Sequence, residues 1–213
     1  MRRLSLPDLK SILCIGAHAD DIEIGCGGTL LRLLAERSGI QVHWLVVTGD
    51  SERASEARTS AEAYVPEHSE LNFECWAQRD GFLPYDGSEV KERFRELQTR
   101  VAPDLVFTHR LEDRHQDHRF LSEMAWNSFR DHLIMEYEIP KYEGDLGNPH
   151  TFVELSAGQA KKKISLLLNH FASQRSKGWF NEQNFEALMR IRGLEAKSAS
   201  GFAEAFTTRK LVF

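Results

Sequence analysis

Short apolar segments alternate with longer amphipathic ones, and this alternation constrains the fold of the sequence more than any other feature. Five short segments rich in β-branched and aromatic residues are predicted strands: residues 11–16, 41–48, 72–76, 104–108 and 133–139. The segments between them are predicted helices: residues 27–39, 51–64, 89–101 and 118–130. Such alternation indicates a parallel sheet with right-handed crossovers and helices on both faces.

Helix-ending and helix-starting signals support these assignments. Gly39 is expected to close the first helix, and Pro66 to stop the second. Residues 86–89 (DGSE) predict a capping box at the start of the third helix. Beyond residue 140, a well-capped helix is expected over 156–170, and another near 181–192.

The predicted fold class is α/β, a Rossmann-like three-layer sandwich with a mostly parallel sheet. For five strands wound in this way we expect the order 3-2-1-4-5. The residues from Pro140 onward should form a C-terminal α/β extension that packs against the sheet. Since no repeat or linker is visible, we expect residues 1–213 to form a single domain.

Charge and cysteine usage narrow the function classes. The net charge is −5, from 27 basic and 32 acidic residues, which argues against sequence-independent nucleic-acid binding. Cys14, Cys26 and Cys75 form no CxxC pair, which indicates a reducing compartment and argues against a thiolate metal site. No apolar run reaches 18 residues, so we expect no membrane span and a cytoplasmic protein. The oligomeric state stays open, a homo-oligomer included.

Histidines and carboxylates cluster directly after two of the predicted strands. Residues 16–21 (GAHADD) follow the first strand, and residues 113–118 (DRHQDH) follow the fourth. In the order 3-2-1-4-5 these strands are neighbours at the switch point, where ligands bind at the carboxyl edge of the sheet. Carboxylates near a core are costly unless something compensates them, so we expect the two segments to hold a cation.

The residue types fit zinc, with iron(II) as an alternative. His18, Asp21 and His118 are the predicted ligands. Asp20 is then left free to act as general base. His115 could face the opposite side of the reacting centre, and Asp117 is a natural partner that fixes the tautomer of an imidazole.

The glycines after the first strand raise a competing interpretation, dinucleotide binding. Gly25 and Gly27 would begin a GxGxxG fingerprint, but Leu30 occupies the third glycine position. This argues against a cofactor-binding oxidoreductase. We expect these glycines, with Gly28, to let the first helix lie close to the sheet.

Two motifs carry a family resemblance. Residues 17–30 (AHADDIEIGCGGTL) closely resemble the AHPDDE-x-x-G-x-G-G signature of the PIG-L/LmbE-like zinc-dependent N-acetylglucosamine deacetylases, and residues 115–118 (HQDH) match the HxDH motif of that family. The resemblance continues to residues 200–206 (SGFAEAF). Residues 79–87, 136–147 and 173–180 also look like a bacterial subgroup associated with polysaccharide biosynthesis.

The resemblance implies the same zinc ligands and the same base. It further implies that His115, oriented by Asp117, steadies the tetrahedral intermediate or protonates the leaving amine. Arg53 with Glu56 resembles a pair that holds the sugar, and Asp80 resembles a residue that contacts substrate hydroxyls.

The chain departs from the family signature at two positions. Ala19 replaces the proline of the signature, and Ile22 replaces its glutamate. Glu23, one position later, is a candidate to replace that glutamate.

The function expected from the sequence is therefore zinc-dependent N-deacetylation of an N-acetylated amino sugar or its conjugate. The mechanism pictured has a protonated His115 stabilising the oxyanion. One alternative is a metal-dependent phosphoesterase, for which Arg110, Arg114 and Arg119 would be the phosphate-binding cations. Another is a non-catalytic sugar-binding protein of the same fold. The sugar and any carrier attached to it are not specified by the sequence.

Overall fold

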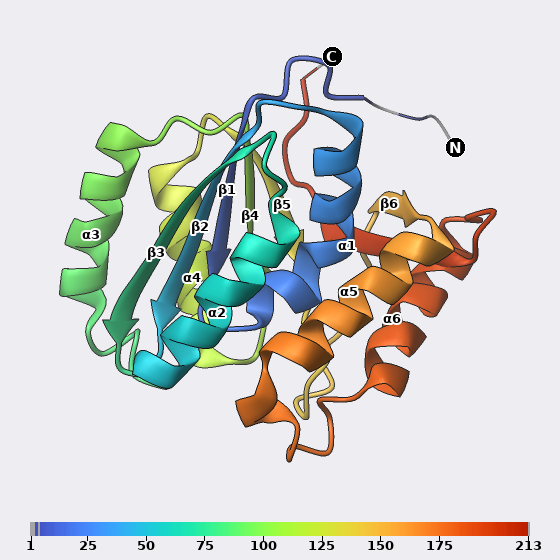
Figure 1. Ribbon diagram of the computed structural model, residues 1–213. Helices are drawn as coiled ribbons and strands as arrows, with labels where there is room; N and C mark the ends of the chain where they lie inside the picture. The colour runs from blue at the N-terminus through green and yellow to red at the C-terminus, as the bar shows by residue number, and fades with distance from the viewer. Residues whose placement is uncertain (1–2, 4, 213) are drawn as a thin grey trace.

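The molecule is built around one mixed sheet with the strand order β3-β2-β1-β4-β5-β7-β6 (Figure 1). The computed structural model describes residues 3 and 5–212. The strands are β1 (Ser11–Gly16), β2 (Gln41–Thr48), β3 (Glu70–Gln78), β4 (Leu105–His109), β5 (Leu133–Tyr137), β6 (Thr151–Leu155) and β7 (Phe202–Thr207). The helices are α1 (Asp21–Glu36), α2 (Ser51–Tyr64), α3 (Gly87–Arg100), α4 (Gln116–Ser128), α5 (Ala157–His170), the 3-10 helix η1 (Ala172–Gln174) and α6 (Glu182–Glu195).

The first five strands are parallel and lie in the predicted order 3-2-1-4-5. The C-terminal extension adds two strands to this sheet. β7 pairs antiparallel with β5, and β6 pairs antiparallel with β7. The α/β fold class with a mostly parallel sheet is therefore confirmed, and the C-terminal part extends the sheet itself as well as covering it.

Both faces of the sheet are buried, which gives the three layers. In β1, Ile12 and Cys14 belong to one core and Leu13 and Ile15 to the other, because successive side chains of a strand point to opposite faces. Helices α1, α2, α5 and α6 contribute to the first core, and α3 and α4 to the second. In Figure 1, α2 and α5 lie in front of the sheet.

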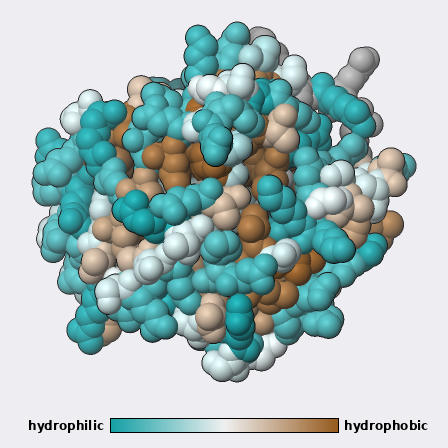
Figure 2. Space-filling view, in the orientation of Figure 1, coloured by the Kyte–Doolittle hydropathy of each residue, from teal (hydrophilic) through white to brown (hydrophobic). Residues whose placement is uncertain are grey.

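The helices turn their apolar residues toward these cores, so the outside is mainly polar. The face seen in Figure 2 is hydrophilic over most of its area, and apolar residues show in patches between the hydrophilic ones. Among the described residues, no helix combines the length and the apolar character needed to cross a membrane.

Helix α1 differs from its predicted bounds, 27–39. It begins at Asp21, because Ile22, Ile24 and Cys26 continue its buried face toward the N-terminus. It ends at Glu36, and Gly39, with φ +73°, belongs to the following turn rather than to the helix cap.

The predicted capping box at 86–89 and the predicted well-capped helix at 156–170 have opposite outcomes. At α3 the box is absent, because Asp86 makes no side-chain cap bond and Glu89 accepts a hydrogen bond from Gln78 at 2.7 Å instead. At α5 the box between Ser156 and Gln159 is confirmed, with both reciprocal hydrogen bonds formed.

Glycines allow α1 to lie against its neighbours, as the sequence predicts. A Cβ atom at Gly25 would lie 2.2 Å from the ring of Tyr137 on β5, and one at Gly28 would lie 2.5 Å from Leu155 on β6. Contacts this short cannot exist, so any larger residue at either position would push α1 away from the sheet.

A buried ion pair also enters the hydrogen bonding of α1. Lys163 of α5 lies 2.6 Å from Glu204 of β7, and both side chains are buried. Lys163 donates to the carbonyl oxygen of Ile24, and Glu204 accepts from the amides of Gly28 and Thr29 at 2.8 and 2.6 Å. The pair therefore forms hydrogen bonds with backbone groups in the middle of α1, as side chains inserted among the backbone hydrogen bonds of a helix do.

Candidate active site and metal centre

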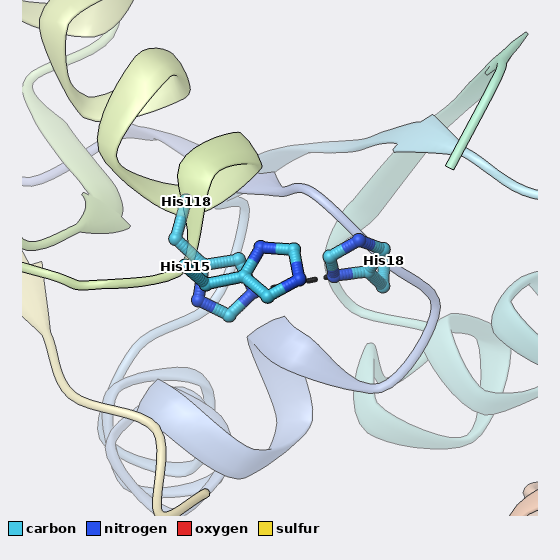
Figure 3. Close-up of side chains that lie close together, drawn as sticks. All are labelled: His18, His115 and His118. Atoms are coloured by element: carbon cyan, nitrogen blue, oxygen red, sulfur yellow. Dashed lines mark hydrogen bonds between the residues drawn. The ribbon is translucent and has the colours of Figure 1, made fainter. Parts of the chain in front are cut away.

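The loops that follow β1 and β4 meet at the carboxyl edge of the sheet. The two strands are direct neighbours, pairing Ile12 with Leu105 and Cys14 with Phe107. His18 from the first loop and His118 from α4 are 100 positions apart, yet their ring nitrogens lie 3.2 Å apart. Figure 3 shows their rings facing each other, with His115 beside them.

Three predicted metal ligands form one tight group of donor atoms. His18 Nδ1 lies 3.2 Å from His118 Nε2 and 3.3 Å from Asp21 Oδ2, and the last two atoms are 3.5 Å apart. Ligand bonds of about 2.0–2.1 Å in tetrahedral geometry put neighbouring ligand atoms roughly 3.3–3.5 Å from each other. The spacing of the three atoms is therefore that of ligands sharing one ion.

The outward nitrogens of both histidines face carboxylates. His118 Nδ1 lies 3.2 Å from Asp113 Oδ2. His18 Nε2 lies 3.0 Å from Asp80 and 3.5 Å from Asp117, although neither contact has hydrogen-bond angles. A carboxylate behind each imidazole is typical of metal-ligating histidines, because it fixes the tautomer that leaves the inner nitrogen free. This donor set fits zinc, with three protein ligands and room for a fourth.

Burial and mutual charge set the protonation of these groups. Burial, followed by the neighbouring His109, lowers the pKa of His118 to about 3, so its ring is uncharged and can act as a ligand. Although burial opposes it, His118, His109 and His18 lower the pKa of Asp21 well below its ordinary value. Burial also lowers the pKa of His18, but the contacts of His18 with carboxylates outweigh burial and raise the pKa well above its ordinary value. The Asp21 carboxylate makes the largest of these contributions.

Asp20 stands in an unusual backbone conformation at the start of α1. Its φ is +105°, a region that side chains rarely adopt but that Asp and Asn tolerate best. Burial raises the pKa of Asp20 to about 7, while the guanidinium of Arg53 opposes this shift. A carboxyl group with this pKa beside a metal site is suited to general-base catalysis at neutral pH.

Arg53 is held within the protein by several acceptors. Its guanidinium lies 3.2 Å from Asp20 Oδ2 and donates to the carbonyl oxygen of Ala19. It also donates to Glu56 at 2.9 Å and to Ser173 at 3.0 Å. The predicted pairing of Arg53 with Glu56 is present, and the guanidinium is directed at Asp20.

His115 lies beside the ligand group, and Asp117 faces a different partner from the predicted one. The ring of His115 is 4.9 Å from that of His18 and 4.5 Å from that of His118 (Figure 3). Its Nδ1 atom is buried and has no hydrogen-bond partner among the described residues. Asp117 accepts from the amides of Gly81 and Leu83 at 2.7 and 3.2 Å, and its carboxylate points toward His18 rather than His115.

Two residues to which the sequence analysis gave no individual role contact the proposed ligands, namely His109 and Asp113 of the predicted segment 113–118. His109, the last residue of β4, stacks on His118 at 3.9 Å and lies 3.3 Å from Asp21. It also accepts the amide hydrogen of Ala17 at 3.0 Å. Asp113 is the carboxylate behind His118. Asp113 belongs to the segment 113–118 that the sequence singles out, but its place in a loop does not show which ligand it contacts. His109 could have been found because it ends a strand at the switch point.

A cleft of about 670 Å³ opens over these groups, within the range of small-molecule sites, roughly 300–1,000 Å³. All three predicted ligands line it, together with the predicted base Asp20 and His115. Of the predicted sugar-contacting residues, Arg53 and Asp80 line it and Glu56 does not. Lys141, Tyr142, Lys177 and Trp179 form other parts of its wall.

Of the residues that depart from the family signature, Ala19 lines this cleft, whereas Ile22 and its neighbour Glu23 do not. Ile22 is completely buried in the core. Glu23 is also buried, and no group in residues 3 and 5–212 forms a hydrogen bond with its Oε1 atom. Burial raises its pKa to about 8. Glu23 does not line the cleft, so it offers no direct replacement there for the glutamate of the signature.

Fold and site together define an α/β protein with a histidine–carboxylate group, a candidate metal centre, at the switch point of its sheet. The family model described as GlcNAc-PI de-N-acetylase, PIG-L, matches residues 13–129, which include both motifs. The chain therefore belongs to the PIG-L/LmbE family of deacetylases. It is also 30% identical over 143 residues to the uncharacterized deacetylase YaiS of Escherichia coli K12, a match covering 62% of this chain and 75% of YaiS.

Solved structures share the fold over nearly the whole chain. The 4-carboxy-2-hydroxymuconate hydratase GalB of Pseudomonas putida superposes with a TM-score of 0.73 at 18% identity, covering 96% of this chain and 98% of GalB. The N,N'-diacetylchitobiose deacetylase of Pyrococcus horikoshii superposes with a TM-score of 0.67 at 21% identity, covering 95% and 84%. A hydratase and a deacetylase thus share this fold, so the reaction has to be argued from the site.

Proposed function

We propose that this protein is a metal-dependent hydrolase that removes the acetyl group from an N-acetylated amino sugar of the GlcNAc type, or from a conjugate of one. The products are acetate and a free amine. The observation that carries the proposal is the group formed by His18, Asp21 and His118, with donor atoms 3.2–3.5 Å apart and Asp20 beside it. Membership of a deacetylase family supports the same reaction.

Each side chain of the site has a separate task in this proposal. A zinc ion held by His18, Asp21 and His118 would lower the pKa of water to about 7 and polarise the acetyl carbonyl, and iron(II) is the alternative ion. Asp20 takes a proton from the attacking water and returns it to the amine nitrogen. Arg53 keeps the carboxylate of Asp20 in place through their 3.2 Å contact.

His115 is proposed to donate a hydrogen bond to the carbonyl oxygen as negative charge develops there. Burial, followed by His18, lowers the pKa of His115, so the ring starts uncharged at neutral pH. The proposal therefore uses an uncharged ring in place of the protonated ring pictured from the sequence. Asp117 orients the site through the loop at Gly81, and Asp80 is proposed to contact substrate hydroxyls from the cleft wall.

The alternatives have less support. A phosphoesterase would need Arg110, Arg114 and Arg119 at the substrate, and none of the three lines the cleft. Arg110 instead donates to the backbone of Asp145 at 2.8 Å. A non-catalytic sugar-binding protein would be expected to lack a ligand or the base, and every one of these residues is in place.

We also propose that residues 1–213 act as one domain in the cytoplasm, in the biosynthesis of a polysaccharide or another glycan. All three cysteines are unpaired, and Cys14 and Cys26 are buried, as suits a reducing compartment.

The test is acetate and amine release from N-acetylated monosaccharides, nucleotide sugars and glycolipids by zinc-loaded protein. We expect release from at least one, and a loss of about 100-fold or more in Asp20→Asn, which keeps the metal ligands. Asparagine also tolerates the backbone of residue 20, so the fold should persist. Unchanged turnover in this variant would remove Asp20 as the base. No release from any substrate by the metal-loaded wild type would refute the proposed activity.

A further inference from the structure

One wall of the cleft comes from the loop between β5 and β6, which has no regular secondary structure. Lys141 and its two neighbours Tyr142 and Glu143 line the cleft from this loop. Within the loop, Lys141 lies 2.6 Å from Asp145. Asp145 in turn accepts from the amide of Arg114, at 2.7 Å, in the β4–α4 loop. The β5–β6 loop that forms this wall is therefore hydrogen-bonded to the loop that leads into the proposed metal centre.

Lys141 also contacts Asp113, the carboxylate that lies beside the proposed ligand His118. Its Nζ atom lies 3.1 Å from both oxygens of Asp113. The Lys141 side chain is 12% exposed, and those of Asp113 and Asp145 are 2% and 6% exposed. One largely buried ammonium group thus lies between two buried carboxylates from different loops. Without it the two negative charges would face each other in a site of low dielectric.

Asp113 connects Lys141 to one of the proposed metal ligands, His118. One of its oxygens accepts the amide of His115 at 2.8 Å, and the other lies 3.2 Å from His118 Nδ1. His118 must carry its hydrogen on Nδ1 to leave Nε2 free toward His18 and Asp21. The orientation of that ring therefore depends on where the Asp113 carboxylate is held, and Lys141 holds it.

We propose that Lys141 is a positioning residue of the metal centre, which acts through Asp113 on His118 and joins the cleft wall to the ligand set. This inference rests on the metal site of the proposed function. It assigns to a cleft-wall lysine an effect on metal affinity, although the lysine is not itself a ligand. Changes to residues that support metal ligands typically weaken metal binding by 10- to 100-fold.

The test measures zinc affinity by competition with a chromophoric chelator. We expect Lys141→Met to weaken zinc binding by about tenfold or more, and to alter the absorption spectrum of the cobalt(II)-substituted protein. Lys177→Met is the matched control, because Lys177 lines the same cleft and forms no ion pair within the described residues. Its zinc affinity and cobalt spectrum should match those of the wild type.

A double variant separates positioning from stability. Lys141→Met/Asp145→Asn removes one of the two carboxylates left facing each other, so it should fold with a melting temperature near that of the wild type while still binding zinc weakly. Wild-type affinity in this folded double variant would overturn the inference alone. A wild-type protein that takes up no zinc would overturn the proposed function as well as the inference.

Discussion

Asp20 combines strain, burial and a shifted pKa in one residue. Its positive φ costs free energy, of order 1–3 kcal/mol, and such strain persists where the surroundings fix it. Here Arg53 and the first turn of α1 provide that fixation, since the carbonyl oxygen of Asp20 accepts the amide of Ile24 at 2.9 Å. The strained turn directs these adjacent side chains differently. Asp20 lies beside Arg53, and Asp21 lies among the proposed metal ligands.

Glu23 makes stability depend on pH. Its pKa is about 8 in the folded protein, against an ordinary value of 4.5 that the unfolded chain retains. Between these values the folded state holds the extra proton, so the free energy of unfolding falls as pH rises, by up to about 1.4 kcal/mol per unit. Glu23→Gln carries no charge at any pH, so in the metal-free protein it should be more stable than the wild type at pH 8 and similar at pH 5.

Urea unfolding of the metal-free wild type and Glu23→Gln from pH 5 to 8 checks this. The difference between the two midpoints should grow steadily with pH. A constant difference would show that Glu23 is already ionised in the folded protein.

At this scale the sequence predicts the residues of the two motifs and misses the contacts that form between loops. His18, Asp21 and His118 were found because they follow adjacent strands of the predicted sheet. Asp113 and Lys141 contact each other across separate loops, and the path of an irregular loop depends on tertiary contacts that local sequence does not encode.

Helix α1 is the element on which the site depends most, since Asp21 begins it. Its two glycine contacts and its bonds to Glu204 all act on the segment from Gly25 to Thr29. The glycines could be interpreted from the sequence as close-packing residues. The Lys163–Glu204 pair could not, because it joins α5 to a C-terminal strand that had no predicted place in the sheet.

Breaking this buried pair should be costly. Glu204→Gln leaves the ammonium of Lys163 buried without its counter-charge, which typically costs 3–5 kcal/mol in the free energy of unfolding. Urea unfolding should show this loss. The control is Glu204→Gln/Lys163→Met, which removes both charges and should recover a large part of it. Equal stability of both variants would mean that the charge of Lys163 is not what destabilises the single one.

Across the whole molecule, the sheet order fixes the site. The parallel order 3-2-1-4-5 was predictable because crossovers have one hand and the chain reverses direction at the first strand. The antiparallel pair β7 and β6 was not, since two short strands separated by two helices give no hairpin signal.

Because the ligands come from both sides of the switch point, metal binding should stabilise the entire fold. At zinc concentrations 100 times the dissociation constant, the gain is about 2.7 kcal/mol, which appears as a higher melting temperature. His118→Ala should abolish this zinc-dependent shift. His150→Ala, a change at an exposed histidine outside the cleft, should preserve it. A full shift in His118→Ala would exclude His118 from the ligand set.

The bonds from Glu204 to α1 bear on the order in which the protein is made. Ribosomal synthesis proceeds from the N-terminus, so a nascent chain exposes every proposed ligand, up to His118, long before β7 exists. Until that last strand forms, the hydrogen bonds from the amides of Gly28 and Thr29 to the Glu204 carboxylate cannot form. If the proposed function holds, we expect tight metal binding only after β7 has formed, because a fragment that stops at residue 129 would contain all the proposed ligands but lack the bonds from Glu204 to α1.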